Sequence, residues 1–202
     1  MRLILASGSA IRAHLLRQAG VAFSVETAPV DEMEIKHSLK AEQVPVERVA
    51  ETLAEAKASR VAARQAGSDH PQTMVIGADQ MLEVDGTWLD KPADLAEARQ
   101  QLLMLRGKSH RLISSVVLIL GGTRIWHHTA QAYLQMRPFS DTFLDQYVAE
   151  AAPAILSSVG CYQLEGIGMQ LFDRIDGDFF TILGLPLLPL LGQLRQHGLM
   201  VD

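Results

Sequence analysis

The chain has 202 residues, of which 48% are hydrophobic and 20% are charged, and its formal net charge is -5. This length can bury a sizeable core, either as one domain or as two small lobes. The acidic balance and the lack of a long basic run exclude a general nucleic-acid binder. The single cysteine, Cys161, excludes an intrachain disulfide and a multi-thiolate metal site, and it fits a reducing cytoplasm.

Two apolar stretches resemble targeting or membrane segments but are too short for either role. Arg2 precedes apolar residues, yet the run covers only residues 3–6, which is too short for a signal peptide. Residues 182–191 are strongly apolar, but they contain a glycine and two prolines and fall below the ~20 residues that a membrane helix needs. We therefore expect a cytoplasmic protein with no membrane partner.

The first half of the chain predicts alternating strands and helices. Apolar spacing and stop signals predict strands at 3–6 and 21–25 and helices at 10–19 and 45–64. Lys57 falls at the edge of the buried face of the long helix. A short apolar strand over 74–77 is expected to end at Ala78-Asp79.

The second half predicts hairpins and amphipathic helices. The expected elements are a hairpin of residues 82–84 and 87–89 about an Asp-Gly turn, a helix over 94–105, two strands at 111–120 and 124–136 joined by Gly121-Gly122, and helices over 140–150 and 189–197. No repeat or linker divides the chain, so we expect a single domain over 1–202. Strands mixed with helices and at least two hairpins predict an α/β or α+β fold with a mixed sheet.

Residues 3–12 have the layout of a phosphate-binding site. A strand that ends in Ser7-Gly8-Ser9 brings backbone N–H groups, two hydroxyls and the positive end of a helix to one point, where anions bind. Arg12 adds a charge whose forked donors suit phosphate oxygens. The structural alternative is that Ser9 caps a helix and Arg12 is solvated.

Asp79 is a candidate for chemistry because it is expected directly after a buried strand, where the ligand sites of α/β sheets gather. A carboxylate there can bind Mg²⁺ or deprotonate a water, whereas the structural alternative is a cap on the following turn. The other groups that phosphate-ester chemistry would need are the acidic pair Asp31-Glu32 and the cations Lys57 and Lys91. Whether these groups converge depends on the fold.

Two other motifs do not carry the chemistry that they suggest. Gly107-Lys108-Ser109 lacks the glycine five positions earlier that a P-loop needs, because Leu102 stands there. His127 and His128 are adjacent in a predicted strand, so they point to opposite faces and do not easily share a metal. Three basic residues either contact a ligand or only follow a helix end: Arg106, Lys108 and His110.

Several motifs, in order along nearly the whole chain, resemble the Maf family of nucleoside triphosphate pyrophosphatases. They are Leu5-Ala6-Ser7-Gly8-Ser9 with Arg12 and Leu15-Leu16, Asp31-Glu32, Ala54-Glu55-Ala56-Lys57-Ala58, Gly77-Ala78-Asp79-Gln80, Lys91-Pro92, Leu105-Arg106-Gly107-Lys108-Ser109-His110, Gly160-Cys161-Tyr162 and Gly184-Leu185-Pro186-Leu187. The resemblance implies an elongated mixed sheet flanked by helices, two lobes around a nucleotide cleft, and a homodimer. It also implies Mg²⁺- or Mn²⁺-dependent cleavage of a nucleoside triphosphate to a monophosphate and pyrophosphate.

Carried over by position, the resemblance assigns a role to each candidate residue. The phosphates would be bound by Ser7, Ser9, Arg12, Lys57 and Lys91. Glu32 and Asp79 would hold the metal, and Asp79 would accept the proton of the attacking water. These roles agree with the chemistry, because charge builds on the phosphate oxygens as pyrophosphate leaves and cations stabilise that charge.

Three positions that vary with substrate in this family are Ile11, Gln80 and Glu165 here. Members that act on dTTP and UTP typically have Arg, Thr and Gln at these three positions, whereas those that act on 7-methyl-GTP resemble this chain at Gln80 and Glu165. A carboxylate accepts from two adjacent N–H donors, which guanine offers and uracil does not. Ile11 departs from the aromatic residue of the 7-methyl-GTP members.

The expected substrate is therefore a methylated purine nucleotide such as 7-methyl-GTP, with dTTP or UTP as the alternatives. Two other classes of function stay open at this point. A non-catalytic nucleotide-binding regulator of septum formation would bind nucleotides without releasing pyrophosphate. A nucleotidyl- or sugar-transferase would need a second, acceptor substrate.

Overall fold

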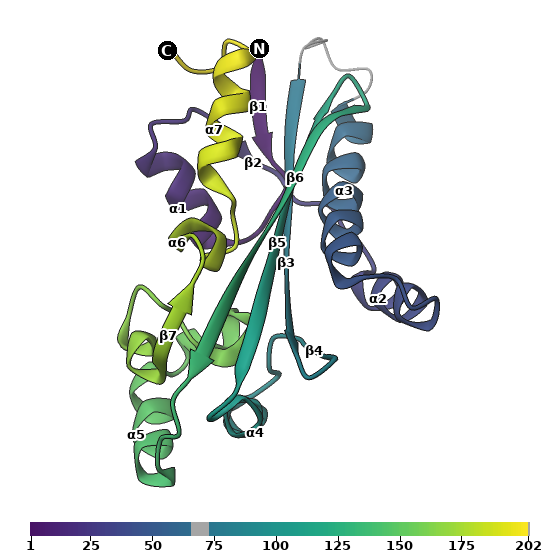
Figure 1. The fold of residues 1–202 in the computed structure, drawn as a ribbon. Coiled ribbons are helices and arrows are strands. Elements are labelled where there is room, and N and C mark those ends of the chain that lie inside the picture. Colours follow the sequence, from purple (N-terminus) through teal and green to yellow (C-terminus); the bar gives the residue numbers. More distant parts are fainter. Residues whose placement is uncertain (66–72, 202) are drawn as a thin grey trace. The chain divides into compact units, whose positions relative to one another are not determined.

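The computed structural model describes residues 1–65 and 73–201, and within them seven strands form one mixed sheet (Figure 1). The strand order is β2-β1-β3-β5-β6-β7, with β4 paired to β3. The strands are β1 (Arg2–Leu5), β2 (Ser24–Val25), β3 (Thr73–Val84), β4 (Thr87–Leu89), β5 (Ser109–Leu120), β6 (Thr123–Met136) and β7 (Phe172–Asp176). The predicted α/β class with a mixed sheet flanked by helices is confirmed.

Seven α-helices and three short 3-10 helices complete the described part of the chain. The α-helices are α1 (Ala10–Gln18), α2 (Glu32–Ala41), α3 (Val46–Gln65), α4 (Leu95–Leu105), α5 (Asp141–Ala151), α6 (Phe179–Ile182) and α7 (Leu187–Gln196). The 3-10 helices are η1 (Ala154–Ser157), η2 (Val159–Cys161) and η3 (Ile167–Leu171). No helix among the residues described is long and apolar enough to span a bilayer.

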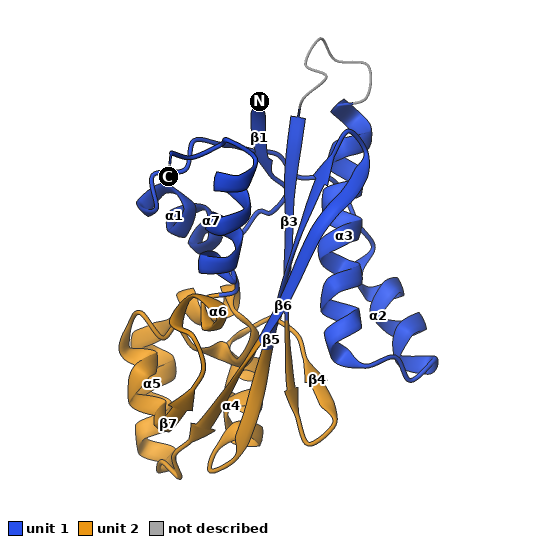
Figure 2. Cartoon of the chain, turned by 45° about the horizontal axis from the view of Figure 1, so that its top comes forward, with its two compact units in different colours: residues 1–80, 113–130, 184–202 blue, residues 81–112, 131–183 orange. Residues whose placement is uncertain are grey.

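The chain divides into two compact units, drawn in blue and orange in Figure 2. The first unit comprises Met1–Gln80, Ile113–Ala130 and Gly184–Asp202, and the second comprises Met81–Leu112 and Gln131–Leu183. Strands β3, β5 and β6 therefore contribute residues to both units. The motifs at Ser7-Gly8-Ser9, Lys57 and Asp79 all lie in the first unit.

In the first unit, β1 lies between β2 and β3 and pairs parallel with both. Helix α3 covers one face of these strands, and α1 and α7 lie on the other side (Figure 1). The core under α3 contains Ile4, Ala58, Val75 and Val117, none of which is more than 1% exposed. A buried, parallel β1–β3 pair explains why residues 3–6 form an uninterrupted apolar run.

The second unit has its own hydrophobic core beneath α4 and α5. Leu102, Leu105, Leu134 and Leu144 are fully buried in it. Helix α4 begins at its N-cap Asp94, whose carboxylate accepts from the Glu97 N–H at 2.8 Å. A capped amphipathic helix with Leu102 and Leu105 on one face needs a partner surface, and the core of the second unit supplies it.

The predicted strand that ends at Ala78-Asp79 is wrong, because β3 continues without a break to Val84. Its first half pairs with β1 through Ile76, and its last residues pair with β4 through Leu82. Partners along both halves keep the backbone extended. Asp79 therefore lies inside a strand and caps no turn.

Other differences concern short or solvated elements. The predicted strand at 21–25 is reduced to two residues, Ser24 and Val25. Helix α2 was not expected, and none of its residues is buried. Its N-cap Asp31 accepts from the Glu34 N–H at 3.0 Å. Strand β7, α6 and the 3-10 helices are likewise too short for a periodic signal.

Candidate functional site

Three predicted residues from three helices and strands meet in the first unit. The Lys57 ammonium on α3 lies 2.5 Å from Asp79 Oδ1 on β3 and 2.9 Å from Glu32 Oε1 at the start of α2. The Asp79 residue is 5% exposed, and the Lys57 side chain is 17% exposed. One lysine thus bridges two carboxylates, one of which is buried.

Small residues explain why α3 and β3 approach closely enough for this contact. A Cβ atom built on Gly77 would lie 2.0 Å from the Ala54 carbonyl oxygen and 2.8 Å from the Ala58 Cβ. Only glycine fits there without moving the helix. Asp79 follows Gly77 by two residues in the strand, so both point to the face that α3 covers. The close approach therefore places Lys57 beside Asp79.

The second carboxylate oxygen of Asp79 is the most unusual atom of the cluster. Oδ2 is buried and has no hydrogen-bond partner among the residues described. An ionised carboxylate oxygen left without a partner in a protein interior is unfavourable. The atom is suited to accept from a water molecule or to bind a cation, while Oδ1 is held by Lys57.

Arg12 is buried and held by three acceptors, so the alternative of a solvated arginine is wrong. Its Nε donates to the Gly184 carbonyl at 2.7 Å, and its Nη1 donates to Ser7 Oγ at 3.1 Å and to the Ala78 carbonyl at 2.9 Å. Burial lowers the pKa of the guanidinium, and the nearby carboxylates of Asp79 and Glu32 oppose that effect. Two backbone carbonyls and the Ser7 hydroxyl therefore fix the orientation of the Arg12 guanidinium.

The hydroxyls of the amino-terminal loop organise the start of α1. Ser9 is the N-cap, and its Oγ accepts from the Arg12 N–H at 3.5 Å, while its own N–H donates to Ser7 Oγ at 3.3 Å. The predicted capping role of Ser9 is confirmed. The first turn of α1 contains no acidic residue, so the positive helix end is not neutralised from within the helix. Ile11 is half-buried in this turn.

Gln80 follows Asp79 and points to the opposite face of β3. Its Nε2 donates to the hydroxyl of Ser114 on β5 at 3.0 Å. Ser114 is fully buried. Ser114 carries no sequence signal, because a serine inside an apolar strand forms no motif.

The two remaining candidates, Lys91 and Glu165, belong to the second unit. Lys91 follows β4, Glu165 lies in a turn before η3, and both are exposed. Their roles toward phosphate and base stay predictions.

The three basic residues whose roles were open are now placed in the second unit. Arg106 Nη1 contacts Asp141 Oδ1 at 2.5 Å, and Lys108 Nζ contacts Asp85 Oδ2 at 2.8 Å, so both form surface ion pairs. His110 is not at the surface, because it is 3% exposed and its Nε2 lies 2.8 Å from the Tyr162 hydroxyl. Burial lowers the pKa of His110 to about 4. The ring is therefore neutral near pH 7.

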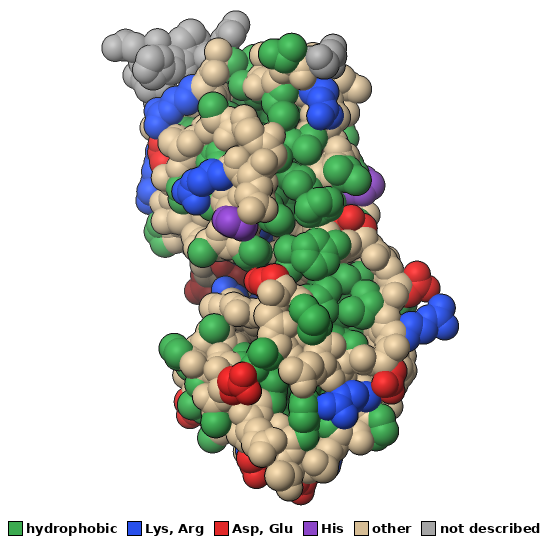
Figure 3. All heavy atoms as spheres, turned by 90° about the vertical axis from the view of Figure 1, so that its left-hand side faces the viewer, with side chains coloured by type: hydrophobic (Ala, Val, Ile, Leu, Met, Phe, Trp, Pro, Cys, Tyr) green, Lys and Arg blue, Asp and Glu red, His purple; other side chains and the backbone are tan. Residues whose placement is uncertain are grey.

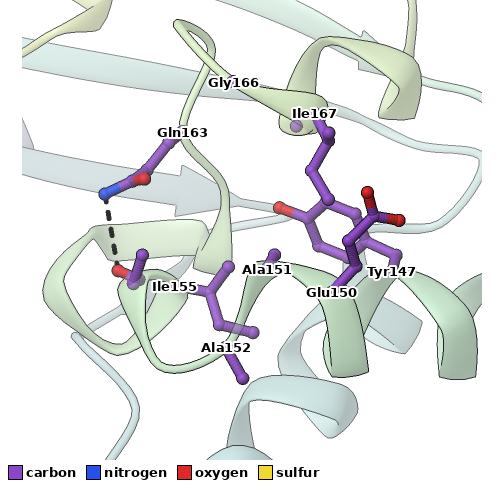
Figure 4. A pocket seen from close by; sticks show the side chains of 10 residues that line it. Tyr147, Glu150, Ala151, Ala152, Ile155, Gln163, Gly166 and Ile167 are labelled. Carbon is purple, nitrogen blue, oxygen red and sulfur yellow. Dashed lines mark hydrogen bonds between the residues drawn. The ribbon is translucent and has the colours of Figure 1, made fainter.

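A pocket of about 220 Å³ in the second unit lies beside the end of α5 (Figure 4). Tyr147 and Glu150 of α5 line it, together with Ile155, Gln163 and Ile167 from the following loops. Its lining includes one carboxylate and no cation, and it contains none of the predicted site residues. These properties do not suit a triphosphate.

Glu32 and Asp79 are the carboxylates that could hold a divalent cation. The buried, unpartnered Oδ2 of Asp79 and the oxygen chemistry of both side chains fit Mg²⁺ or Mn²⁺. Within residues 1–65 and 73–201, no group of three or more His, Cys, Asp or Glu residues could hold a metal.

The fold and this cluster define an α/β protein whose first unit contains a serine-capped helix start and a lysine-bridged pair of carboxylates. Residues 2–197 match the family model described as Maf-like protein, and the chain belongs to that family. The resemblance stated from the sequence motifs is confirmed.

Similar proteins cover the chain from end to end. The chain is 58% identical over 198 residues to a nucleoside triphosphate pyrophosphatase of Paramagnetospirillum magneticum. The aligned region covers 98% of this chain and 100% of that protein. It is 49% identical to the protein of the same name from Rhodospirillum rubrum, covering 98% and 96% of the two chains. It is 44% identical to a 7-methyl-GTP pyrophosphatase of Rhizobium etli, again covering 98% and 96%.

Proposed function

We propose that this protein is a hydrolase that cleaves a nucleoside triphosphate to a monophosphate and pyrophosphate. The observation that carries the proposal is the buried Asp79 carboxylate, with Oδ1 bound to Lys57 and Oδ2 without a partner. Two of its relatives are named nucleoside triphosphate pyrophosphatases, and these names support the same reaction. Support for Asp79 as the base is that Lys57 holds one of its oxygens, whereas the other oxygen has no hydrogen-bond partner among the described residues.

In this mechanism, Asp79 Oδ2 accepts the proton of the water that attacks the nucleotide phosphate. Lys57 holds the carboxylate in a single orientation through Oδ1. Arg12 and the positive end of α1, whose first turn contains no acidic residue, would stabilise the negative phosphates, whose charge grows as pyrophosphate leaves. Lys91 of the second unit is proposed as a further phosphate ligand.

A divalent metal would add positive charge at the phosphate oxygens, and Glu32 and Asp79 are the residues that would hold it. Both carboxylates already contact Lys57, so they lie within reach of one cation. Mg²⁺ and Mn²⁺ are the ions proposed, because both prefer oxygen ligands.

For the base, we propose a methylated guanine nucleotide such as 7-methyl-GTP. Gln80 and Glu165 match the pattern of the members that act on this nucleotide, and the relative from Rhizobium etli carries that name. The half-buried Ile11 would give the base an aliphatic contact instead of an aromatic one.

The test is a panel of triphosphates assayed for pyrophosphate release with Mg²⁺ or Mn²⁺. The panel includes 7-methyl-GTP, GTP, dTTP and UTP, with wild-type protein and water as the only acceptor. We expect the highest kcat/KM with 7-methyl-GTP. A preference for dTTP or UTP would contradict the base assignment alone. Binding without pyrophosphate release from any nucleotide would contradict the enzyme and favour a regulator.

We also propose that the protein is a homodimer in the cytoplasm. Hydrophobic side chains reach the surface in several places on the face shown in Figure 3. In the second unit, Tyr133, Met169 and Phe179 are each about half exposed. An interface between two copies of the chain would cover exposed apolar groups such as these. Light scattering during gel filtration would show twice the chain mass, and the mass of a single chain would contradict the proposal.

A further inference from the structure

Gly184 is a motif residue that the proposed reaction does not use, yet it touches the candidate site. Its φ angle is +93°, a backbone conformation that residues with a side chain rarely adopt. The Gly184 carbonyl oxygen accepts from Arg12 Nε at 2.7 Å, across 172 positions of sequence. The segment that leads into α7 is thereby connected to the start of α1.

The hydrogen bonds of Arg12 leave one end of its guanidinium available. Nε and Nη1 together donate to the Gly184 carbonyl, the Ala78 carbonyl and the Ser7 hydroxyl. The three hydrogen bonds described for the Arg12 side chain come from Nε and Nη1, and none of them comes from Nη2. A guanidinium held on one edge presents its other donors in a defined direction, which suits a phosphate oxygen.

The missing side chain of Gly184 lies against this free end. A Cβ atom at this position would be 3.3 Å from Arg12 Nη2, 3.4 Å from Arg12 Nε and 3.5 Å from Gln80 Oε1. The first of these distances is tighter than ordinary contact, so a methyl group would move the guanidinium by a few tenths of an ångström. The contact with Gln80 is ordinary van der Waals contact and requires no movement.

We propose that Gly184 is a positioning residue for Arg12 in the binding of the triphosphate. Its carbonyl holds Nε, and its lack of a side chain leaves Nη2 free to donate to phosphate. The inference rests on the proposed function only in that Arg12 binds phosphate. It predicts that Gly184 affects the phosphate chain and not the choice of base.

The test compares Gly184→Ala with Gly20→Ala as a matched control. Gly20 also lies in the first unit and has a φ of +74°, but a Cβ atom there would meet nothing within 4 Å. Both variants therefore carry backbone strain, and only one of them displaces Arg12. The loss of thermal stability, measured by circular dichroism, is expected to be similar for the two.

The readout is binding of inorganic triphosphate, measured by calorimetry without metal, together with KM and kcat on the nucleotide panel. We expect Gly184→Ala to weaken triphosphate binding about tenfold, because a charge-assisted hydrogen bond is partly lost. KM should rise by a similar factor for every nucleotide, with kcat within about twofold of wild type. Gly20→Ala should change neither quantity.

Two results would overturn the proposal. In one, Gly184→Ala binds triphosphate as tightly as Gly20→Ala does. In the other, the variant changes the ratio of kcat/KM between nucleotides and leaves triphosphate binding intact. That result would show that Gly184 acts on base selection through Gln80 and not on phosphate binding through Arg12. If Gly184→Ala does not fold at the assay temperature, Gly184→Asn takes its place, because asparagine tolerates a positive φ better. Wild-type protein that binds triphosphate but hydrolyses no nucleotide would contradict the proposed reaction and leave this inference testable.

Discussion

Two buried polar atoms, one in each unit, have no hydrogen-bond partner within the described residues, and their surroundings give them opposite properties. Asp79 Oδ2 of the first unit belongs to a carboxylate that contacts Lys57. His110 Nδ1 of the second unit belongs to a ring packed near Tyr162 and Phe172, with ring centroids 5.7 and 6.0 Å away. The first atom is buried beside the Lys57 ammonium, whereas the second is buried among aromatic rings, where a neutral imidazole is favoured.

Two other buried groups of the second unit, the hydroxyl of Tyr162 and the thiol of Cys161, are also uncharged at neutral pH. Burial raises the pKa of Tyr162 well above its ordinary value and raises that of Cys161 to about 12. The Cys161 thiol donates to Gln101 Oε1 at 3.3 Å. Such a thiol carries almost no thiolate at neutral pH and does not act as a nucleophile. This polar cluster of the second unit therefore serves packing, while that of the first unit supplies charge.

The largest expected effect comes from Asp79→Asn, which removes the open oxygen as a base. We expect pyrophosphate release to fall by roughly two or more decades, the scale of a lost general base, with the fold retained. Stopped assays of pyrophosphate and thermal unfolding of the same preparation measure the two quantities. Near-normal turnover would contradict the role of Asp79 and remove the difference between the two buried atoms.

Lys57→Met is expected to have the next largest effect, because Asp79 loses the cation that holds it. We expect kcat/KM to fall about 10- to 100-fold, since a hydrogen bond to a charged group contributes about 1.5–3 kcal/mol. Lys40→Met is the matched control, because it removes the same charge from the exposed end of α2. Equal activity of the two variants would show that only net charge matters.

His110 predicts a loss of stability in acid. Because the pKa of His110 is about 4 in the folded protein and ordinarily 6.5, the unfolded chain binds the proton more readily between these values. The contribution of the neutral His110 ring to the free energy of unfolding is fully present above pH 6.5, and it is lost as the pH falls from 6.5 toward 4. The expected loss is about 2 kcal/mol between pH 8 and pH 5.

The measurement is urea unfolding of wild type and His110→Phe at several pH values. The variant leaves the Tyr162 hydroxyl unpaired, so it should be less stable at every pH. The difference between the two proteins should nevertheless shrink as the pH falls. A constant difference from pH 8 to pH 5 would show that His110 does not titrate in this way.

The smallest effect is expected from Lys108→Ala in the second unit. Its partner is Asp85, and the two side chains are 47% and 67% exposed. Ion pairs exposed to this degree contribute little, so stability should change by less than about 0.5 kcal/mol. Pyrophosphate release should stay at the wild-type rate, and a loss of more than fivefold would place Lys108 in the site.

Much of the fold was predictable from local patterns. Ser140 and Asp94 cap their helices as their residue types predict, and the turns at Asp85-Gly86 and Gly121-Gly122 both use positive φ angles. The break predicted before Asp79 was wrong, because β-pairing on both halves of β3 outweighs the local signal. Helix α2 was not predicted, and none of its residues is buried in the core.

The site residues of the first unit were predictable in kind but not in contact. The motifs named Ser7, Arg12, Glu32, Lys57 and Asp79, yet no motif shows that one ammonium bridges two carboxylates or that Arg12 is held by the Gly184 carbonyl. Ser114 had no sequence signal at all, since its partner Gln80 is 34 residues away. Contacts of this separation arise only when strands pair and helices pack.

By itself, the sequence determined the α/β class, most element positions, the family and the residue types available for phosphate chemistry, because these depend on periodicity, capping and local motifs. Only the tertiary structure decided that Asp79 lies inside a strand and keeps one buried oxygen open, and that His110 is neutral. Both outcomes depend on desolvation and on partners distant in sequence. Those two quantities are set by packing, and a local pattern of residues does not encode them.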